Sequence, residues 1–254
     1  MLASMSEALQ LRPDGFRERG GQVTRLDAFV DAAYAFALTM LVISVGSLPD
    51  SMPKLLEALK GTPAFAASFA QIAYFWYAHV TWSRRYGLDD LPTTVLSLVM
   101  VFLVLVYIYP LRALFATFFS WIGPGWLPIG FALDSMVDVR MMFVVYGLVF
   151  GTMGLSICSL YLHAWRRRDD LELTLHERIM TVEMMVRWLI PVAFASLSIA
   201  AALSLPEHPA GWATGLPGVL YLLMAFAQPI PAVVGRRFRR HLMSAHVGSV
   251  GGTR

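Results

Sequence analysis

Long apolar stretches recur along the chain and are separated by short polar segments that carry most of its charges. Crossing a hydrocarbon core of roughly 30 Å at 1.5 Å per residue takes about 20 mostly apolar residues. Backbone groups in lipid must be bonded within their own segment, so each stretch of this length is expected to be an α-helix. The predicted helices lie near residues 25–48, 62–84, 92–118, 138–165, 184–205 and 212–236. The pattern therefore predicts an all-α, polytopic membrane protein with six transmembrane helices.

The arginines indicate how these helices are oriented, because Lys and Arg near helix ends favour the cytoplasmic side. They precede the first helix and follow the second, fourth and sixth, as Arg84 and Arg85, Arg166 to Arg168, and Arg236, Arg237, Arg239 and Arg240. Both termini are therefore expected in the cytoplasm. We expect a cytoplasmic segment over residues 1–24, a six-helix transmembrane domain over 25–240, and a flexible cytoplasmic tail over 241–254. Such a chain is a multi-pass protein of the cell membrane.

Composition narrows the class of function further. Hydrophobic residues make up 57% of the chain and charged residues only 15%, whereas an average soluble domain is about a quarter charged. The net charge of +3 comes from short clusters at helix ends rather than from one basic stripe, so we expect no nucleic-acid partner. One cysteine, Cys158, cannot form a thiolate metal cluster, and we expect neither a metal site nor a cofactor.

A membrane enzyme is a possible class, with His79 and His163 as acid–base groups. The H-E-x-x-H, G-x-S-x-G and P-loop motifs are missing, and we therefore do not expect an enzyme. The Trp- and Gly-rich segment near residues 119–134 is expected in the outer interface. A re-entrant pore loop is the alternative there, although the T-V-G-Y-G filter is absent.

Ionisable residues in or beside a membrane span are costly, and the first predicted helix carries Arg25 and Asp31. Six residues apart, they cannot pair with each other as i,i+4 neighbours do, so each needs a partner on another helix. Trp76 and His79 share one face of the second helix, and His79 is a candidate partner. A buried polar network that locks the helices together is the simplest interpretation.

A second pattern on the first helix is a stripe with one hydroxyl, formed by Ala32, Phe36, Thr39 and Ile43 at helical spacing. In one interpretation the stripe packs against a neighbouring helix, and Thr39 bonds a carbonyl of its own helix. In the other, large apolar side chains from several subunits constrict and dewet a narrow pore. The spacing leaves both interpretations open.

The first helix also carries a family motif. It reads Arg25, Phe29, Val30 and Asp31, followed by the run DAAYAFALTML. This resembles the R-x-x-x-F-S-D motif of the endosomal/lysosomal potassium channel family, transmembrane protein 175, including its prokaryotic members. Further matching positions are Ser68, Trp76, His79, Arg84, Arg85 and Pro110. The resemblance extends over the six-helix length and is specific in the first two helices.

The resemblance implies a homotetrameric, potassium-selective or potassium-preferring channel, with potassium ions and the lipid bilayer as partners and with the first helices around the pore. Phe36 would then form the hydrophobic constriction, Thr39 a hydroxyl layer and Ile43 the next apolar ring, with Ala32 on the same face. The motif residues would form an interhelical network, made of Arg25, Phe29, Asp31, Trp76 and His79. This chain departs from the family in Val30, which replaces the motif serine, and in Phe36, where Ile or Leu is usual. A proton-conducting or proton-coupled transporter that uses Asp31 and His79 is the alternative function.

Overall fold

The computed structural model describes residues 11–44, 49–123, 133–208 and 212–250, with side chains up to residue 240. Within these ranges the regular structure is helical, and β-structure is limited to an isolated bridge between Leu11 and Arg17. The α-helices are α1 Arg25–Ile43, α2 Met52–Lys60, α3 Thr62–Tyr86, α4 Leu91–Ile122, α5 Met136–Arg166, α6 Leu175–Leu203, α7 Leu216–Leu223 and α8 Ile230–Val250. Two 3₁₀ turns, η1 Ala213–Gly215 and η2 Met224–Ala227, flank α7.

Four of the described helices are long and apolar enough to cross a membrane, namely α1, α4, α5 and α6. The segments Ala213–Ala227 and Ile230–Arg240 meet at an angle of 42° and add a fifth candidate if they form one broken span. α3 has 25 residues, which is long enough, but side chains such as Gln71, His79 and Arg84 make it more polar. The chain is therefore an all-α membrane protein with four to five candidate spans in its described part.

The helices differ from the predicted ranges in ways that have local causes. α6 begins at Leu175, before the predicted start at 184, because Thr174 and Glu177 form a capping box that starts the helix in its polar flank. The predicted helix over 212–236 is divided into η1, α7, η2 and α8, and α8 continues to Val250, past residue 240. The short amphipathic helix α2 was not predicted. Residues 45–48 of the first predicted helix and 124–132 of the Trp-rich segment lie outside the described residues.

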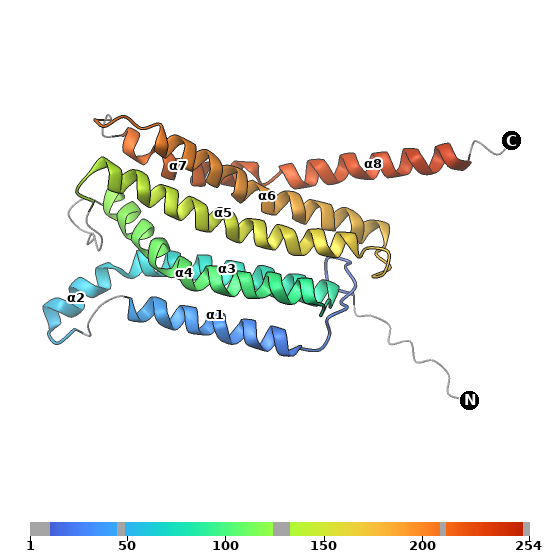
Figure 1. Ribbon diagram of the computed structural model, residues 1–254, viewed down its shortest axis with the longest axis horizontal. Coiled ribbons are helices and arrows are strands. Elements are labelled where there is room, and N and C mark those ends of the chain that lie inside the picture. Colours follow the sequence, from blue (N-terminus) through green and yellow to red (C-terminus); the bar gives the residue numbers. More distant parts are fainter. Residues whose placement is uncertain (1–10, 45–48, 124–132, 209–211, 251–254) are drawn as a thin grey trace.

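The helices form a bundle in which α1 lies at one edge and α6 and α7 lie at the other (Figure 1). α5 and α6 approach closely because α5 presents glycines to α6; a Cβ on Gly147 would lie 2.7 Å from the Ile199 side chain. α1 packs against α3 and α4 mainly through its buried stripe of Val30, Tyr34, Ala37 and Leu41. α8 packs against α6 and then extends beyond the bundle, and its far end lies at the same end of the bundle as the start of α1 (Figure 1).

Candidate functional site on helix α1

Helix α1 has one buried and one exposed face. Ala32, Phe36, Thr39 and Ile43 all lie on the exposed face, and the side chains of Phe36 and Ile43 are 56% and 62% exposed. In the most apolar 18-residue window of α1, only 22% of residues are buried, compared with 33% to 56% in the other three candidate spans. Within this single chain, therefore, no neighbouring helix buries the predicted stripe.

The hydroxyl of this stripe is bonded within its own helix. The Thr39 Oγ1–H donates to the Ala35 carbonyl at 3.0 Å. This bond, which links a residue to the carbonyl one turn earlier, leaves the lone pairs of Oγ1 directed away from the helix backbone. An exposed hydroxyl in this state can still accept a hydrogen bond or contact a cation.

Asp31 finds its partner on α3, and that partner is Trp76. The indole Nε1–H of Trp76 donates to Asp31 Oδ1 at 2.7 Å. His79 does not take this place, because its Nε2 lies 2.9 Å from the Ser97 hydroxyl on α4. Residues three apart on a helix differ by about 60° in direction, so Trp76 points toward α1 while His79 points toward α4. Trp76 and His79 therefore lie on neighbouring parts of the α3 surface, as their spacing predicts, but they contact different helices.

Other predicted network residues take no part in these bonds. Arg25 is exposed at the first turn of α1, and among the described residues its side chain has no hydrogen bond or ion pair. Phe29 is 53% exposed and lies on the open face of α1. Val30, which stands where the family motif has serine, is fully buried against the core. A valine suits this position because no polar atom is left unpaired there.

The start of α1 is fixed by Asp27, which the sequence reading overlooked. Asp27 Oδ2 accepts from the Thr24 backbone N–H at 3.0 Å, and the Asp27 backbone N–H donates to Thr24 Oγ1 at 3.1 Å. The second carboxylate oxygen, Oδ1, accepts from the Ser83 hydroxyl on α3 at 2.7 Å. The sequence signal was the T-x-x-D pattern just before an apolar run, which is typical of a capping box.

Residues 11–24, here called the N-terminal strap, lie across one end of the bundle. Phe16 is fully buried, and its ring centroid lies 5.4 Å from that of Tyr86. The Arg19 and Gly20 backbone N–H groups donate to the Arg84 carbonyl at 3.1 and 3.0 Å. Gly87, which ends α3 with φ +58°, permits this contact because a Cβ there would lie 2.8 Å from the Arg19 backbone. The strap is thus ordered up to the first residue of α1.

Two ion-pair clusters hold the strap. Glu177, whose side chain is fully buried, accepts from Arg17 and Arg19 at 3.0 Å each. Asp14 pairs with Arg85 at 2.7 Å. Burial alone would raise the pKa of Asp14, but the Phe16 N–H and the Arg85 guanidinium outweigh it and hold the pKa below its ordinary value. These contacts connect the chain segment just before α1 to α3 and α6.

Comparison with known proteins identifies the family. Residues 25–110 match the family model described as "Endosomal/lysosomal potassium channel TMEM175". A protein of Marivirga tractuosa named "Potassium channel" is 32% identical over 231 residues, which cover 87% of this chain and 90% of that protein.

Two solved structures are also similar. A variant of the potassium channel MtTMEM175 in complex with a nanobody–MBP fusion matches with a TM-score of 0.76 and 30% identity, over 91% of this chain and 100% of that one. A TMEM175 homologue from Chamaesiphon minutus, titled a lysosomal potassium-selective channel, shares the fold with a TM-score of 0.50 at 19% identity, over 80% and 96% of the two chains. The motif on α1, the matching family model and a relative that is similar over nearly its whole length place this chain in the TMEM175 family.

Proposed function

We propose that this chain is the subunit of a homotetrameric potassium channel in the cell membrane, with α1 of each subunit lining the pore. The observation that carries the proposal is the stripe on α1, which is exposed in the isolated subunit although it lies on the helix with the family motif. Four such stripes facing a common axis would bury each other and leave a narrow path between them. Potassium as the permeant ion is supported by the names of the relatives.

In this arrangement Phe36 forms the constriction. Its side chain is 56% exposed and lies near the middle of the 19-residue helix. Rings at this level exclude water and therefore close the path unless their rotamers swing aside. Thr39 lies one turn farther along and offers the first hydroxyl beyond the constriction, while Ala32 and Ile43 line the path on either side.

The polar contacts of α1 serve this function as anchors. Asp31 is bonded to Trp76, and Asp27 is bonded to Ser83, so two carboxylates fix the first two turns of α1 against α3. A helix that lines a pore has few contacts on its open side, and bonds of this kind fix its rotation about its own axis. Arg25 is placed to extend this anchor toward a neighbouring subunit.

The proposed topology has six spans, with both termini in the cytoplasm. α3 is the second span, and the broken segment from η1 to α8 is the sixth. The N-terminal strap and the far end of α8 lie at the same end of the bundle (Figure 1), as an even number of spans requires. Clusters of arginine lie at this end, in the last turn of α3, at the end of α5 and within α8, which is the pattern of a cytoplasmic face.

Potassium flux into liposomes reconstituted with purified protein tests the pore assignment. Phe36→Ala should raise the flux because it removes the ring from the constriction, and Thr39→Val should reduce the preference for potassium over sodium. The matched controls are Phe102→Ala, which removes an exposed ring of α4, and Thr152→Val, which removes an exposed hydroxyl of α5 with the same bond to the carbonyl one turn earlier. Both controls should behave like wild type.

Two outcomes would contradict the proposal. Absence of flux in wild type and in Phe36→Ala, despite intact tetramers, would refute the proposed channel function. Equal effects of Phe36→Ala and Phe102→Ala would instead show that α1 does not line the path. A pH-sensitive dye inside the same liposomes measures whether protons carry the current.

A further inference from the structure

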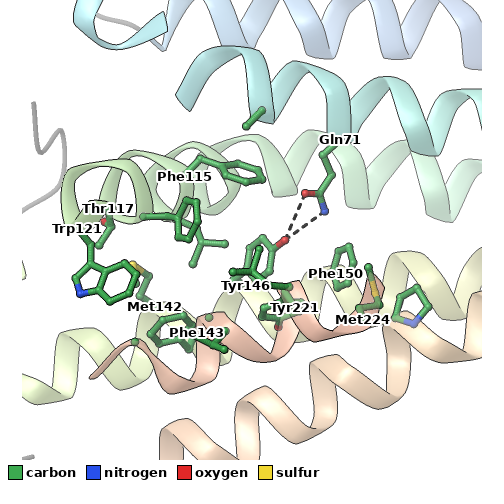
Figure 2. Close-up of a pocket in the computed structure, with 18 of the residues that line it drawn as sticks. Gln71, Phe115, Thr117, Trp121, Met142, Phe143, Tyr146, Phe150, Tyr221 and Met224 are labelled. Atoms are coloured by element: carbon green, nitrogen blue, oxygen red, sulfur yellow. Dashed lines mark hydrogen bonds between the residues drawn. The ribbon is translucent and has the colours of Figure 1, made fainter. Parts of the chain in front are cut away.

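A cavity of about 530 Å³ lies away from α1, between α3, α4, α5, α6 and the segment around α7. Its walls are mostly aromatic and aliphatic, and Figure 2 shows Phe115, Phe143, Phe150 and Tyr221 turned toward it. Its volume falls within the range of about 300–1,000 Å³ that is usual for ligand sites. None of its lining residues comes from α1, so the cavity is separate from the proposed pore.

The cavity opens on the surface of the bundle. Three of the residues that line it, Tyr74, Trp121 and Leu222, are 51%, 56% and 56% exposed. Trp121 lies in the last turn of α4, whereas Tyr74 lies in the middle of α3, so the opening runs along the direction of the helices. An apolar groove that opens beside the middle of a membrane-spanning helix faces acyl chains rather than water. Its interior polar group, Gln71, is already bonded to the Tyr107 and Tyr146 hydroxyls.

One end of the cavity carries a charge without a partner. Arg187 lines it, is exposed, and lies near the start of the apolar part of α6, because the residues from Leu175 to Glu183 include the polar flank of that helix. An arginine at this edge of a membrane span extends its guanidinium toward the headgroup region. Among the described residues no carboxylate lies within 4.0 Å of it, and Glu183, one turn earlier on α6, forms no ion pair either. Gln228, which also lines the cavity, adds an exposed amide to the lining.

We propose that this cavity binds an anionic phospholipid of the bilayer, with one acyl chain along the aromatic walls and the phosphate on Arg187. Charge complementarity carries the choice of lipid. A guanidinium pairs with phosphate through two parallel hydrogen bonds, and such bonds are strengthened by charge. Helical side chains tilt toward the helix N-terminus, so Arg187 reaches toward the end where α6 begins, which is the membrane surface nearest to it. A zwitterionic lipid would bring a compensating positive charge to the same place.

Native mass spectrometry of delipidated protein, titrated with phosphatidylglycerol or with phosphatidylcholine of the same acyl chains, tests the proposal. Wild type should retain phosphatidylglycerol about tenfold better, and Arg187→Gln should bind both lipids equally. Ala70→Phe, which fills the cavity from α3, should lose both lipids. The matched controls are Ala66→Phe, one turn earlier on α3 and outside the cavity, and Arg236→Gln, an exposed arginine of α8 outside it. Both controls should bind like wild type.

Three results would overturn the proposal. The first is equal retention of the two lipids by wild type, and the second is an unchanged preference in Arg187→Gln. The third is unchanged binding in Ala70→Phe. If Ala70→Phe fails to fold, as shown by size-exclusion chromatography, Gly215→Leu fills the cavity from its other side, where a Cβ meets Trp121 only at 3.6 Å. Lipid retention is read without ion flux, so this test is independent of the proposed channel function.

Discussion

The burial of Glu177 makes the attachment of the N-terminal strap sensitive to a single charge. Glu177→Gln keeps the side-chain length and still caps α6, since glutamine is accepted at this position of a capping box. It removes the negative charge that pairs with Arg17 and Arg19 at 3.0 Å. Two guanidinium groups then remain in the strap without their counterion. The strap should therefore detach more readily, while α6 stays helical.

The size of the effect follows from the exposure of the three side chains. Breaking a fully buried ion pair by removal of one partner costs about 3–5 kcal/mol. The Glu177 side chain is fully buried, but those of Arg19 and Arg17 are 9% and 28% exposed, so water can partly resolvate them. We therefore expect the lower end, about 3 kcal/mol. This corresponds to a roughly hundredfold increase in the detached population.

Limited digestion with trypsin measures this population, because Arg17 and Arg19 are themselves cleavage sites within the strap. When opening and closing are fast, cleavage follows the fraction of open molecules. Glu177→Gln should be cleaved at these sites much faster than wild type. The control is Glu207→Gln, which makes the same charge change at an exposed residue that forms no ion pair within the described part of the chain and lies beyond the opposite end of α6 from the strap. Equal cleavage rates in the two variants would refute the argument.

Two further predictions concern the anchors of α1. Trp76→Phe should lower stability because Asp31 loses its indole donor. A double-mutant cycle with Asp31→Ala, which removes the acceptor, should give a coupling of about 1 kcal/mol in detergent unfolding, and zero coupling would mean that the 2.7 Å bond contributes nothing. For Asp14, whose pKa is lowered in the folded state, the contribution to stability is present above the unfolded value of about 3.9 and is lost as the pH falls through the folded pKa. The stability difference between wild type and Asp14→Asn should thus shrink during acid titration, and a constant difference would contradict this assignment.

Much of the helical architecture could be predicted because membrane spans are set by length and apolarity. α4 and α5 begin and end within about four residues of their predicted ranges, whereas α8 continues fourteen residues past the predicted end at 236 and α6 begins nine residues before its predicted start. That error arose because an apolar run marks where a helix enters lipid, not where its hydrogen bonds begin. α2 was missed because nine residues with alternating charges and leucines are too short for a span.

The site was predictable in part. Helical spacing placed Ala32, Phe36, Thr39 and Ile43 on one face, but only the structure shows that this face is exposed. Sequence reasoning required a partner for Asp31 and named His79 as the candidate, whereas the structure gives Trp76, because the partner depends on how α3 is rotated against α1 and α4. No sequence pattern predicted that the N-terminal strap packs against the bundle. Phe16 is one of three large apolar residues in a mostly polar segment, and its burial depends on contacts with residues far away in the sequence.

The strap and Asp27 give α1 a mechanical property. Its first two turns are tied to α3 by hydrogen bonds, whereas its far end is held by apolar packing alone, through Ala37 and Leu41. A helix that is bonded at its base and only packed at its far end tilts most easily about the base, and Ile43 lies about 27 Å from Arg25 at 1.5 Å per residue. A tilt of about 5° then displaces Ile43 by about 2 Å but leaves Asp31, about 9 Å from the same point, displaced by less than 1 Å. Small forces on the far end of α1 would therefore change the width of the proposed pore there first, while the base of the helix keeps its position.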